Sequence, residues 1–177
     1  MKKLVLVLAL VAVISVGTAF AHPDGWGIGL QGGGGLNWVG FGFGGGSALT
    51  LKAPTVPIYW GIYFDFYAGF DGFGWIAGLT ADYYFLDLPF ASNWLHFYIG
   101  AGGAFGFGIL YQGLAIDLKA RLPIGLSLQI PIKSGLDVLE FYFQLVPSAG
   151  VRLGFFDPFR ASFAGGLGFD VGFRLWF

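Results

Sequence analysis

The sequence of 177 residues contains no cysteine. This absence excludes a disulfide framework, a thiolate metal site and a lipid-modified cysteine. Charged residues are scarce as well, at 11% of the chain, whereas a soluble domain has about a quarter. Because the net charge is only −1, the chain has no basic field that would attract nucleic acid.

Apolar runs long enough to cross a membrane as a helix are also missing. The one long apolar stretch, residues 4–16, follows a pair of lysines and precedes Gly-Thr-Ala-Phe-Ala at 17–21. About thirteen residues fall short of the roughly twenty that a bilayer requires. A charged start, a short apolar centre and a small-x-small site are typical of a secretory signal peptide.

Two segments are therefore expected. Residues 1–21 form a signal peptide that signal peptidase removes near Ala21, and residues 22–177 form one exported domain. The alternative is a retained N-terminal anchor.

What the chain has in abundance is hydrophobic residues, at 56%, and glycine, with 32 residues. Residues 163–177 show how they are arranged. Every second position is apolar or glycine, while the alternate positions include Asp170, Arg174 and Trp176. A period of two indicates a β-strand. An apolar face opposite a glycine-rich and charged face, in segments of about ten residues, is typical of a transmembrane β-barrel strand.

The end of this stretch has a second expected role. Phe173, Leu175 and Phe177 continue the apolar face to the last residue. An aromatic terminal residue preceded by alternating apolar positions resembles the assembly signal of bacterial outer-membrane barrels. The expected partner of this segment is the barrel-assembly machinery.

The same pattern recurs along the chain and predicts eight strands, with Pro123 marking a bulge or a missing ladder bond in the sixth. The strands cover residues 25–30, 38–51, 58–70, 73–85, 95–107, 114–129, 139–145 and 163–177. Breaks are expected at 32–35, 52–57, 71–72, 86–93, 110–113, 131–137 and 154–162. The predicted fold is all-β, a closed eight-stranded antiparallel up-and-down transmembrane β-barrel.

The polar residues of these strands are sorted onto one face. The charges on the non-apolar parity are Asp65, Asp82, Asp117, Lys119, Arg121, Glu140, Asp170 and Arg174. A charge on the lipid face would cost about 2–4 kcal/mol at the bilayer midplane. Six of the eight tyrosines share this parity, namely Tyr59, Tyr63, Tyr67, Tyr84, Tyr98 and Tyr142. Because a phenol hydroxyl needs a hydrogen-bond partner that lipid does not offer, these residues predict a polar lumen.

An even strand count places both ends of the barrel on the periplasmic side. Aromatic residues are then expected at both membrane interfaces. Those on the periplasmic side are Trp60, Phe85, Trp94 and Phe177, and those on the outer side are Trp38, Phe70, Phe73 and Phe107. The rival architecture, a helical membrane protein, would lose about 1 kcal/mol for each of the many glycines inside its helices.

An eight-stranded barrel is only wide enough for its interior to be filled by side chains. We therefore expect a hydrogen-bonded plug, with a gated narrow conduit as the alternative. Arg121 and Arg174 are both predicted to reach Glu140, because their strands are neighbours of the strand that carries it.

Catalysis and metal binding find little support. His96 is predicted inside the barrel, across a turn from Asp82 and Tyr84, as an imidazole–carboxylate pair of the orienting kind. No serine can be placed beside this pair, so the chain is not expected to be an enzyme. No metal and no cofactor are expected either.

Several motifs resemble a known family. They are Thr-Ala-Asp-Tyr-Tyr at 80–84, Phe-Tyr-Ile-Gly-Ala-Gly-Gly at 97–103, Arg-Leu-Pro-Ile-Gly-Leu at 121–126, Leu-Glu-Phe at 139–141 with Pro147, and residues 166–177. Together they are similar to the small eight-stranded outer-membrane proteins of spirochaetes, which are themselves similar to the membrane domain of OmpA and to OmpW. The resemblance covers roughly residues 73–177. It implies a fold and an outer-membrane location, and it carries over no functional residues.

The expected function is that of a monomeric integral outer-membrane protein with a structural or surface-interaction role. Its partners would be outer-membrane lipid and a host or surface ligand that the sequence does not identify. Phe155, Phe156, Pro158 and Phe159 either lie in the lipid interface or recognise a partner. The alternative function is a narrow channel or a conduit for hydrophobic small molecules across the outer membrane.

Overall fold

The computed structural model describes residues 23, 25–38, 42–69, 72–92, 94–110, 113–132, 136–155 and 159–177. These residues form an all-β structure with nine strands. The strands are β1 (Gly27–Asn37), β2 (Gly42–Lys52), β3 (Ile58–Gly69), β4 (Gly72–Ser92), β5 (Leu95–Leu110), β6 (Gly113–Arg121), β7 (Ile124–Pro131), β8 (Val138–Phe155) and β9 (Arg160–Trp176). The predicted signal peptide, Phe70, Asp71, Phe156 and Pro158 lie outside the described residues. Within the described ranges, no helix has the length and apolarity to cross a membrane.

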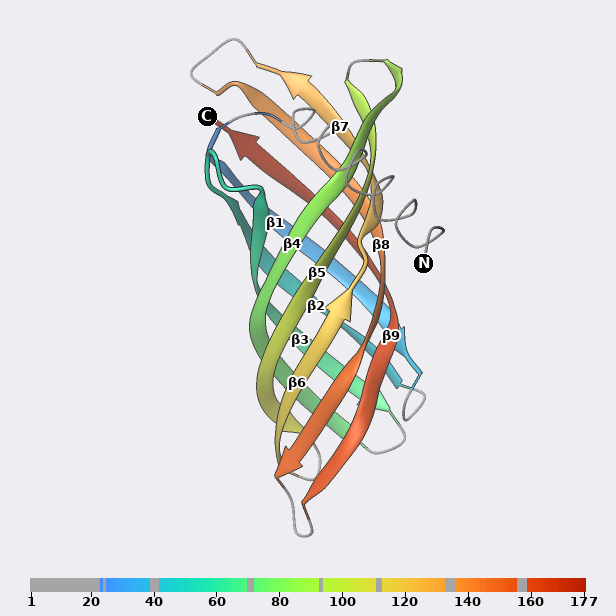
Figure 1. Ribbon diagram of the computed structural model, residues 1–177. Coiled ribbons are helices and arrows are strands. Elements are labelled where there is room, and N and C mark those ends of the chain that lie inside the picture. The colour runs from blue at the N-terminus through green and yellow to red at the C-terminus, as the bar shows by residue number, and fades with distance from the viewer. Residues whose placement is uncertain are drawn as a thin grey trace, which may run out of the picture.

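All strand pairs are antiparallel, and the pairs join into one sheet that closes on itself (Figure 1). The closing pair is β1 with β9, which are in register from Gly27 opposite Trp176 to Asn37 opposite Gly166. β6 and β7 share one position between β5 and β8. The result is an up-and-down sheet with a ring of eight strand positions. The predicted all-β class and antiparallel topology are confirmed.

The break between β6 and β7 falls at Leu122 and Pro123, as the sequence predicts. Proline has no N–H to donate to the ladder, so the regular pairing stops at this point. The backbone remains partly bonded, because Gly100 N donates to Pro123 O at 2.8 Å and Leu122 N donates to Pro147 O at 3.0 Å. The alternation of inward and outward side chains therefore continues through the break.

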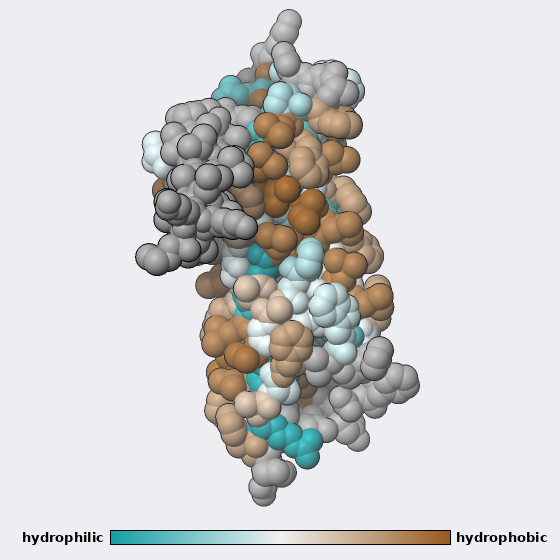
Figure 2. All heavy atoms as spheres, turned by 45° about the vertical axis from the view of Figure 1, so that its right-hand side comes forward, coloured by the Kyte–Doolittle hydropathy of each residue, from teal (hydrophilic) through white to brown (hydrophobic). Residues whose placement is uncertain are grey.

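The two faces of the sheet are sorted by polarity. Large hydrophobic side chains point away from the ring; Ile62 is 60% exposed, Leu79 50% and Phe105 47%. Figure 2 shows hydrophobic residues over much of the described surface on the side that it displays. The largest enclosed side chains are instead aromatic and polar, among them Trp176, Arg174, Tyr98, Gln144, Glu140 and Asp117. This distribution of hydrophobic and polar side chains is the reverse of that in a typical water-soluble protein.

The turn predicted at residues 32–35 is wrong, because β1 runs through these glycines. Gly33 pairs with Gly46 of β2 on one side and with Asp170 of β9 on the other. A β-carbon on Gly33 would collide with the Phe169 carbonyl oxygen and the Asp170 carboxylate. Gly33 is therefore required by close packing inside the ring and not by a turn.

The turn predicted at residues 86–93 is also wrong. β4 continues to Ser92 and stays paired with β5, with a register shift between Tyr84 and Leu86. The shift changes which residues face the interior, and it buries Asp87 to 4% exposure. A register shift of this kind is a β-bulge, which a period-two reading of the sequence cannot follow.

Two further strand ends differ from the prediction. β8 extends past residue 145 to Phe155 and β9 begins at Arg160, so the loop predicted at 154–162 is shorter. β2 includes Lys52, which the sequence predicts to lie in the break at residues 52–57. The Lys52 side chain is only 6% exposed. Both extensions bring additional charged residues, Arg152 and Lys52, into the ring.

The described chain ends lie together at one end of the ring, which we call the terminal end (Figure 1). Trp26 and Phe177 exchange backbone hydrogen bonds of 2.9 and 3.0 Å there, and Asp137 N donates to Trp176 O at 2.8 Å. At the opposite end, which we call the far end, β1, β3, β5 and β8 end and β2, β4, β6 and β9 begin (Figure 1).

Candidate functional site: the polar interior of the ring

All of the polar residues predicted to face inward that lie in β3 to β9 are buried or half-buried. Buried are Tyr59, Tyr84, Tyr98, Tyr142, Asp82, His96, Asp117, Glu140 and Arg174. Half-buried are Tyr63, Tyr67, Asp65, Lys119, Arg121 and Asp170. The predicted assembly residues are on the other face, where Phe173 and Leu175 are half-buried and Phe177 is 46% exposed. Their role in assembly stays a prediction.

Stacked aromatic rings fill the interior near the terminal end. Tyr84 lies between Tyr59 and Tyr98, with ring centroids 4.3 and 4.7 Å apart. Trp176 approaches Tyr59 edge-on at 6.2 Å. These residues and Tyr142 form the one cluster of buried hydrophobic side chains in the part of the chain that the structure describes. We call this cluster the tyrosine plug.

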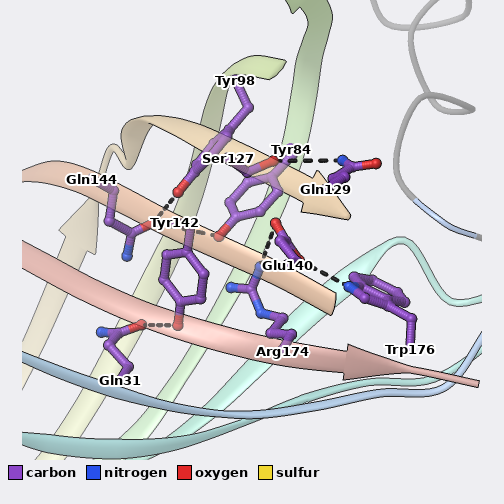
Figure 3. A network of polar contacts seen from close by, with 10 residues as sticks. All are labelled: Gln31, Tyr84, Tyr98, Ser127, Gln129, Glu140, Tyr142, Gln144, Arg174 and Trp176. Atoms are coloured by element: carbon purple, nitrogen blue, oxygen red, sulfur yellow. Dashed lines mark hydrogen bonds and ion pairs between the residues drawn. The ribbon is translucent and has the colours of Figure 1, made fainter. Parts of the chain in front are cut away.

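A buried ion pair runs through the tyrosine plug. Arg174 of β9 lies opposite Glu140 of β8, and its Nη1 is 3.3 Å from Glu140 Oε2. Trp176 Nε1 donates to the same carboxylate at 2.9 Å. The Arg174 guanidinium also lies 4.1 Å from the ring centre of Tyr142 and 4.8 Å from that of Tyr59. Figure 3 shows Glu140 and Tyr142 of β8 beside Arg174 and Trp176 of β9.

Amide side chains connect the plug to the middle of the ring (Figure 3). Gln144 Oε1 accepts from the Tyr98 hydroxyl at 3.0 Å, and Gln144 Nε2 donates to Asp170 Oδ2 at 3.0 Å. On the other side, the Tyr142 hydroxyl donates to Gln31 Oε1 at 2.9 Å. A hydrogen-bonded network of this kind holds its members in fixed positions when each is satisfied.

The middle of the ring is organised by Arg121. Its Nε is 3.1 Å from Asp82 Oδ1, and its Nη2 is 3.8 Å from Asp170 Oδ2. The predicted pair of Arg121 with Glu140 is therefore wrong, whereas the predicted pair of Arg174 with Glu140 is confirmed. The register explains the difference, because Glu140 lies opposite Gln129 of β7 and Arg121 lies opposite Ser148, farther along β8.

A third ion cluster lies nearer the far end and includes a residue that the sequence prediction missed. Arg152 donates two hydrogen bonds to Asp117, at 2.6 and 2.7 Å, and Lys119 Nζ is 2.9 Å from the same carboxylate. The signal was present, because Arg152 has the same parity as Glu140 and Gln144. The prediction omits Arg152 because the predicted strand ends at residue 145.

His96 has a different partner from the one predicted. Its Nδ1 lies 2.9 Å from Asp87 Oδ1, while Asp82 is opposite Gly102 and Tyr84 is opposite Gly100. Ser127 lies directly opposite His96 in the β5–β7 pair, so a serine does stand beside the imidazole–carboxylate pair. Ser127 has no exposed surface, so it offers no face to an external substrate.

The interior also contains a cavity of about 160 Å³. It extends from Asn37 and Gly166, at the far-end limits of β1 and its β9 partner, to Tyr59 and Arg174 of the tyrosine plug. Its lining includes the charged side chains of Asp65, Asp82, Asp170, Lys119 and Arg121. Glycines of β1 and β2 form the opposite wall. Among the described residues, no group of three or more His, Asp and Glu side chains is arranged to hold a metal ion.

No protein-family model, no curated protein and no solved structure matches this chain.

Proposed function

We propose that this protein is an integral outer-membrane β-barrel with a structural or surface-interaction role and a lumen closed by side chains. In this proposal residues 1–21 are removed on export, and the ring of residues 22–177 spans the bacterial outer membrane. One observation carries it: large hydrophobic side chains are exposed on the outside of the ring, whereas charged and polar side chains are buried inside it. A closed ring leaves no unpaired strand edge, which is the condition for a sheet to lie in hydrocarbon.

The height of the apolar surface supports membrane insertion. On β9 the outward positions run from Phe163 to Leu175, which is about 40 Å along the strand at about 3.3 Å per residue. With a strand tilt of about 45°, this length corresponds to about 28 Å along the membrane normal. A bilayer core is about 30 Å thick, so the match is close.

The family remains part of the proposal. The motifs at 80–84, 97–103 and 121–126 support membership in the small eight-stranded outer-membrane proteins of spirochaetes. The ring of eight strand positions is consistent with that membership.

The closed lumen is supported by the tyrosine plug. The stacked rings of Tyr59, Tyr84 and Tyr98 lie at one end of the cavity, together with the buried Arg174–Glu140 pair. Ions crossing the ring would have to displace this layer. The charged side chains that line the cavity also argue against the alternative of a conduit for hydrophobic molecules.

Single-cysteine variants test membrane insertion cleanly, because the chain has no cysteine of its own. A nitroxide label would be placed in turn at each of residues 75–81 of β4, with the protein folded into lipid vesicles. We expect high accessibility to oxygen, which dissolves in lipid, at the odd positions, which include Leu79, and low accessibility at the even ones. Water-soluble relaxation agents reaching the odd positions would refute insertion.

Recordings in planar lipid bilayers test the closed lumen separately. The unaltered protein is expected to give no reproducible conductance steps. Tyr84→Ala removes the central ring of the stack and is expected to give small steps. Reproducible steps in the unaltered protein would support the narrow channel instead.

A further inference from the structure

The middle of the cavity wall that β1 and β2 form is lined by glycines. Gly33 and Gly35 of β1 and Gly44 and Gly46 of β2 line it with backbone alone. Both neighbouring strands place a carboxylate beside this wall, since Asp170 is opposite Gly33 and Asp65 is opposite Gly46. Gly33 and Gly46 are themselves partners, so the order across four strands is Asp170, Gly33, Gly46, Asp65.

The two carboxylates lean over the glycines between them. A β-carbon on Gly46 would collide with Asp65 Oδ1, and one on Gly33 would collide with Asp170 Oδ1. The glycine pair is therefore the floor of a trough whose two rims are acidic. We call this part of the cavity the glycine trough.

Asp65 differs from the other acids of the interior. Asp82 and Asp170 face Arg121, Asp117 binds Arg152 and Lys119, Glu140 binds Arg174, and Asp87 binds His96. For Asp65, no cation lies within ion-pair distance in the described part of the chain, and the Tyr67 hydroxyl is its polar neighbour. The glycine trough thus presents an acid whose charge is not balanced by a salt bridge.

The charge count of the interior gives the same result. The inward acids are Asp65, Asp82, Asp87, Asp117, Glu140 and Asp170, and the inward bases are Lys52, Lys119, Arg121, Arg152 and Arg174. Six acids against five bases leave one negative charge among the described interior residues when His96 is neutral. A single positive charge in the cavity would balance it.

A second observation independently indicates a ligand. Thr50 lines the cavity on the plug side of the glycine trough and is 5% exposed, yet its hydroxyl has no hydrogen-bond partner within 3.5 Å, although Tyr142 is a polar neighbour. A buried hydroxyl without a partner costs about 1–3 kcal/mol. A ligand that carried a polar group at this depth would remove that cost.

We propose that the cavity binds a small water-soluble organic cation, an amine that carries a hydroxyl or similar polar tail. The ammonium group binds the Asp65 carboxylate beside the ring of Tyr63, which favours a cation through its π face. The tail points along the glycine trough towards Thr50. The cavity volume of about 160 Å³ limits the ligand to a small molecule.

The test uses the folded full-length mature chain in neutral maltoside micelles and 4-aminobutanol as the probe. Backbone amide NMR signals of Gly33 and Gly46 report on the glycine trough. We expect saturable shifts with 4-aminobutanol and binding at least about tenfold weaker with butane-1,4-diol, which replaces the ammonium with a hydroxyl. Equal binding of the amine and the diol, or no saturable shift with the amine, would overturn the proposal.

Two substitutions locate the ammonium group. Asp65→Asn is expected to weaken amine binding about tenfold, because it removes the charge and keeps the shape. The matched control Asp137→Asn changes an exposed acid in the turn before β8 and is expected to leave binding unchanged. Unaltered binding by Asp65→Asn would overturn the proposal. If that variant does not fold, Thr50→Val replaces it and is expected to weaken the amine several-fold; no change would count against the site.

An amine can also come from a lipid headgroup. The same NMR signals would therefore be compared in bicelles that contain phosphatidylethanolamine or phosphatidylglycerol, without added amine. We expect no difference at Gly33 and Gly46, because the paired backbone of the ring separates the cavity from the lipid face. A shift with phosphatidylethanolamine alone would assign the site to a lipid and overturn the proposal of a free amine. These measurements do not depend on membrane insertion, so they fail or succeed separately from the proposed function.

Discussion

Arg152 of β8 lies directly opposite Asp117 of β6, and the two side chains share hydrogen bonds of 2.6 and 2.7 Å. Arg152→Ala leaves the buried Asp117 carboxylate with Lys119 alone. We expect the free energy of unfolding to fall by about 2 kcal/mol, the value of a charge-assisted hydrogen bond inside a protein. Urea unfolding in lipid vesicles measures this.

The matched control for Arg152 is Arg160→Ala. Arg160 is exposed at the start of β9, and its loss is expected to change the unfolding free energy by less than about 0.5 kcal/mol. Equal losses for the two arginines would mean that Arg152 does not act through Asp117.

Gly46 tests the packing of the glycine trough. Its β-carbon would collide with the Phe64 carbonyl oxygen and with Asp65 Oδ1, so Gly46→Ala is expected to lower stability by about 1–3 kcal/mol. Gly32 lies on the same pair of strands but has open space, since the nearest atom to a β-carbon there is 3.8 Å away. Gly32→Ala is expected to be near neutral in the same unfolding measurement, and similar losses at both sites would contradict the packing argument.

The free-energy cost of a charge on the outward face is expected to depend on its depth in the bilayer. Leu118 is 47% exposed on β6, on the hydrophobic outer surface of the ring. It lies opposite Phe105 of β5 and Val151 of β8. Leu118→Arg is expected to destabilise the vesicle-inserted protein by about 2–4 kcal/mol. Ile130→Arg, near the turn after β7, is expected to cost at most about 1 kcal/mol. An equal cost at both sites would argue against a bilayer around the ring.

Trp176 tests the buried ion pair. Trp176→Phe keeps the ring in the tyrosine plug and removes the donor to Glu140. We expect a loss of about 1.5–3 kcal/mol, because the carboxylate loses a charge-assisted hydrogen bond where water does not reach it. Thermal unfolding monitored by circular dichroism gives the comparison, and the exposed Trp94→Phe is the control. A loss no larger than that of the control would show that Glu140 does not need this donor.

The alternation of inward and outward side chains was predictable, because side chains alternate between the two faces of a strand wherever the strand begins or ends. Asp65, Asp117 and Arg174 are therefore inside the ring, as the sequence indicates. Strand ends were not predictable in the same way. Glycines at 32–35 have the composition of a turn, and only the Asp170 side chain beside them reveals why they belong to a strand.

The ion pairs were less accessible to prediction than the faces. The alternation along the sequence predicts that Arg121 and Glu140 both point inward. Which of the inward side chains form ion pairs depends on the register of β6, β7 and β8. The same limit applies to His96, whose partner Asp87 faces inward only because of the register shift after Tyr84. Neither the register nor the bulge leaves a mark in the hydrophobic pattern.

The pairing of β1 with β9 has a consequence for how the ring closes. Every bulky inward residue that β9 contributes to this pair meets glycine on β1: Trp176 faces Gly27, Arg174 faces Gly29 and Asp170 faces Gly33. The first strand therefore brings no large side chain that must be threaded past its partner. A larger side chain at Gly27, Gly29 or Gly33 would meet these residues and obstruct the joining of the first strand to the last.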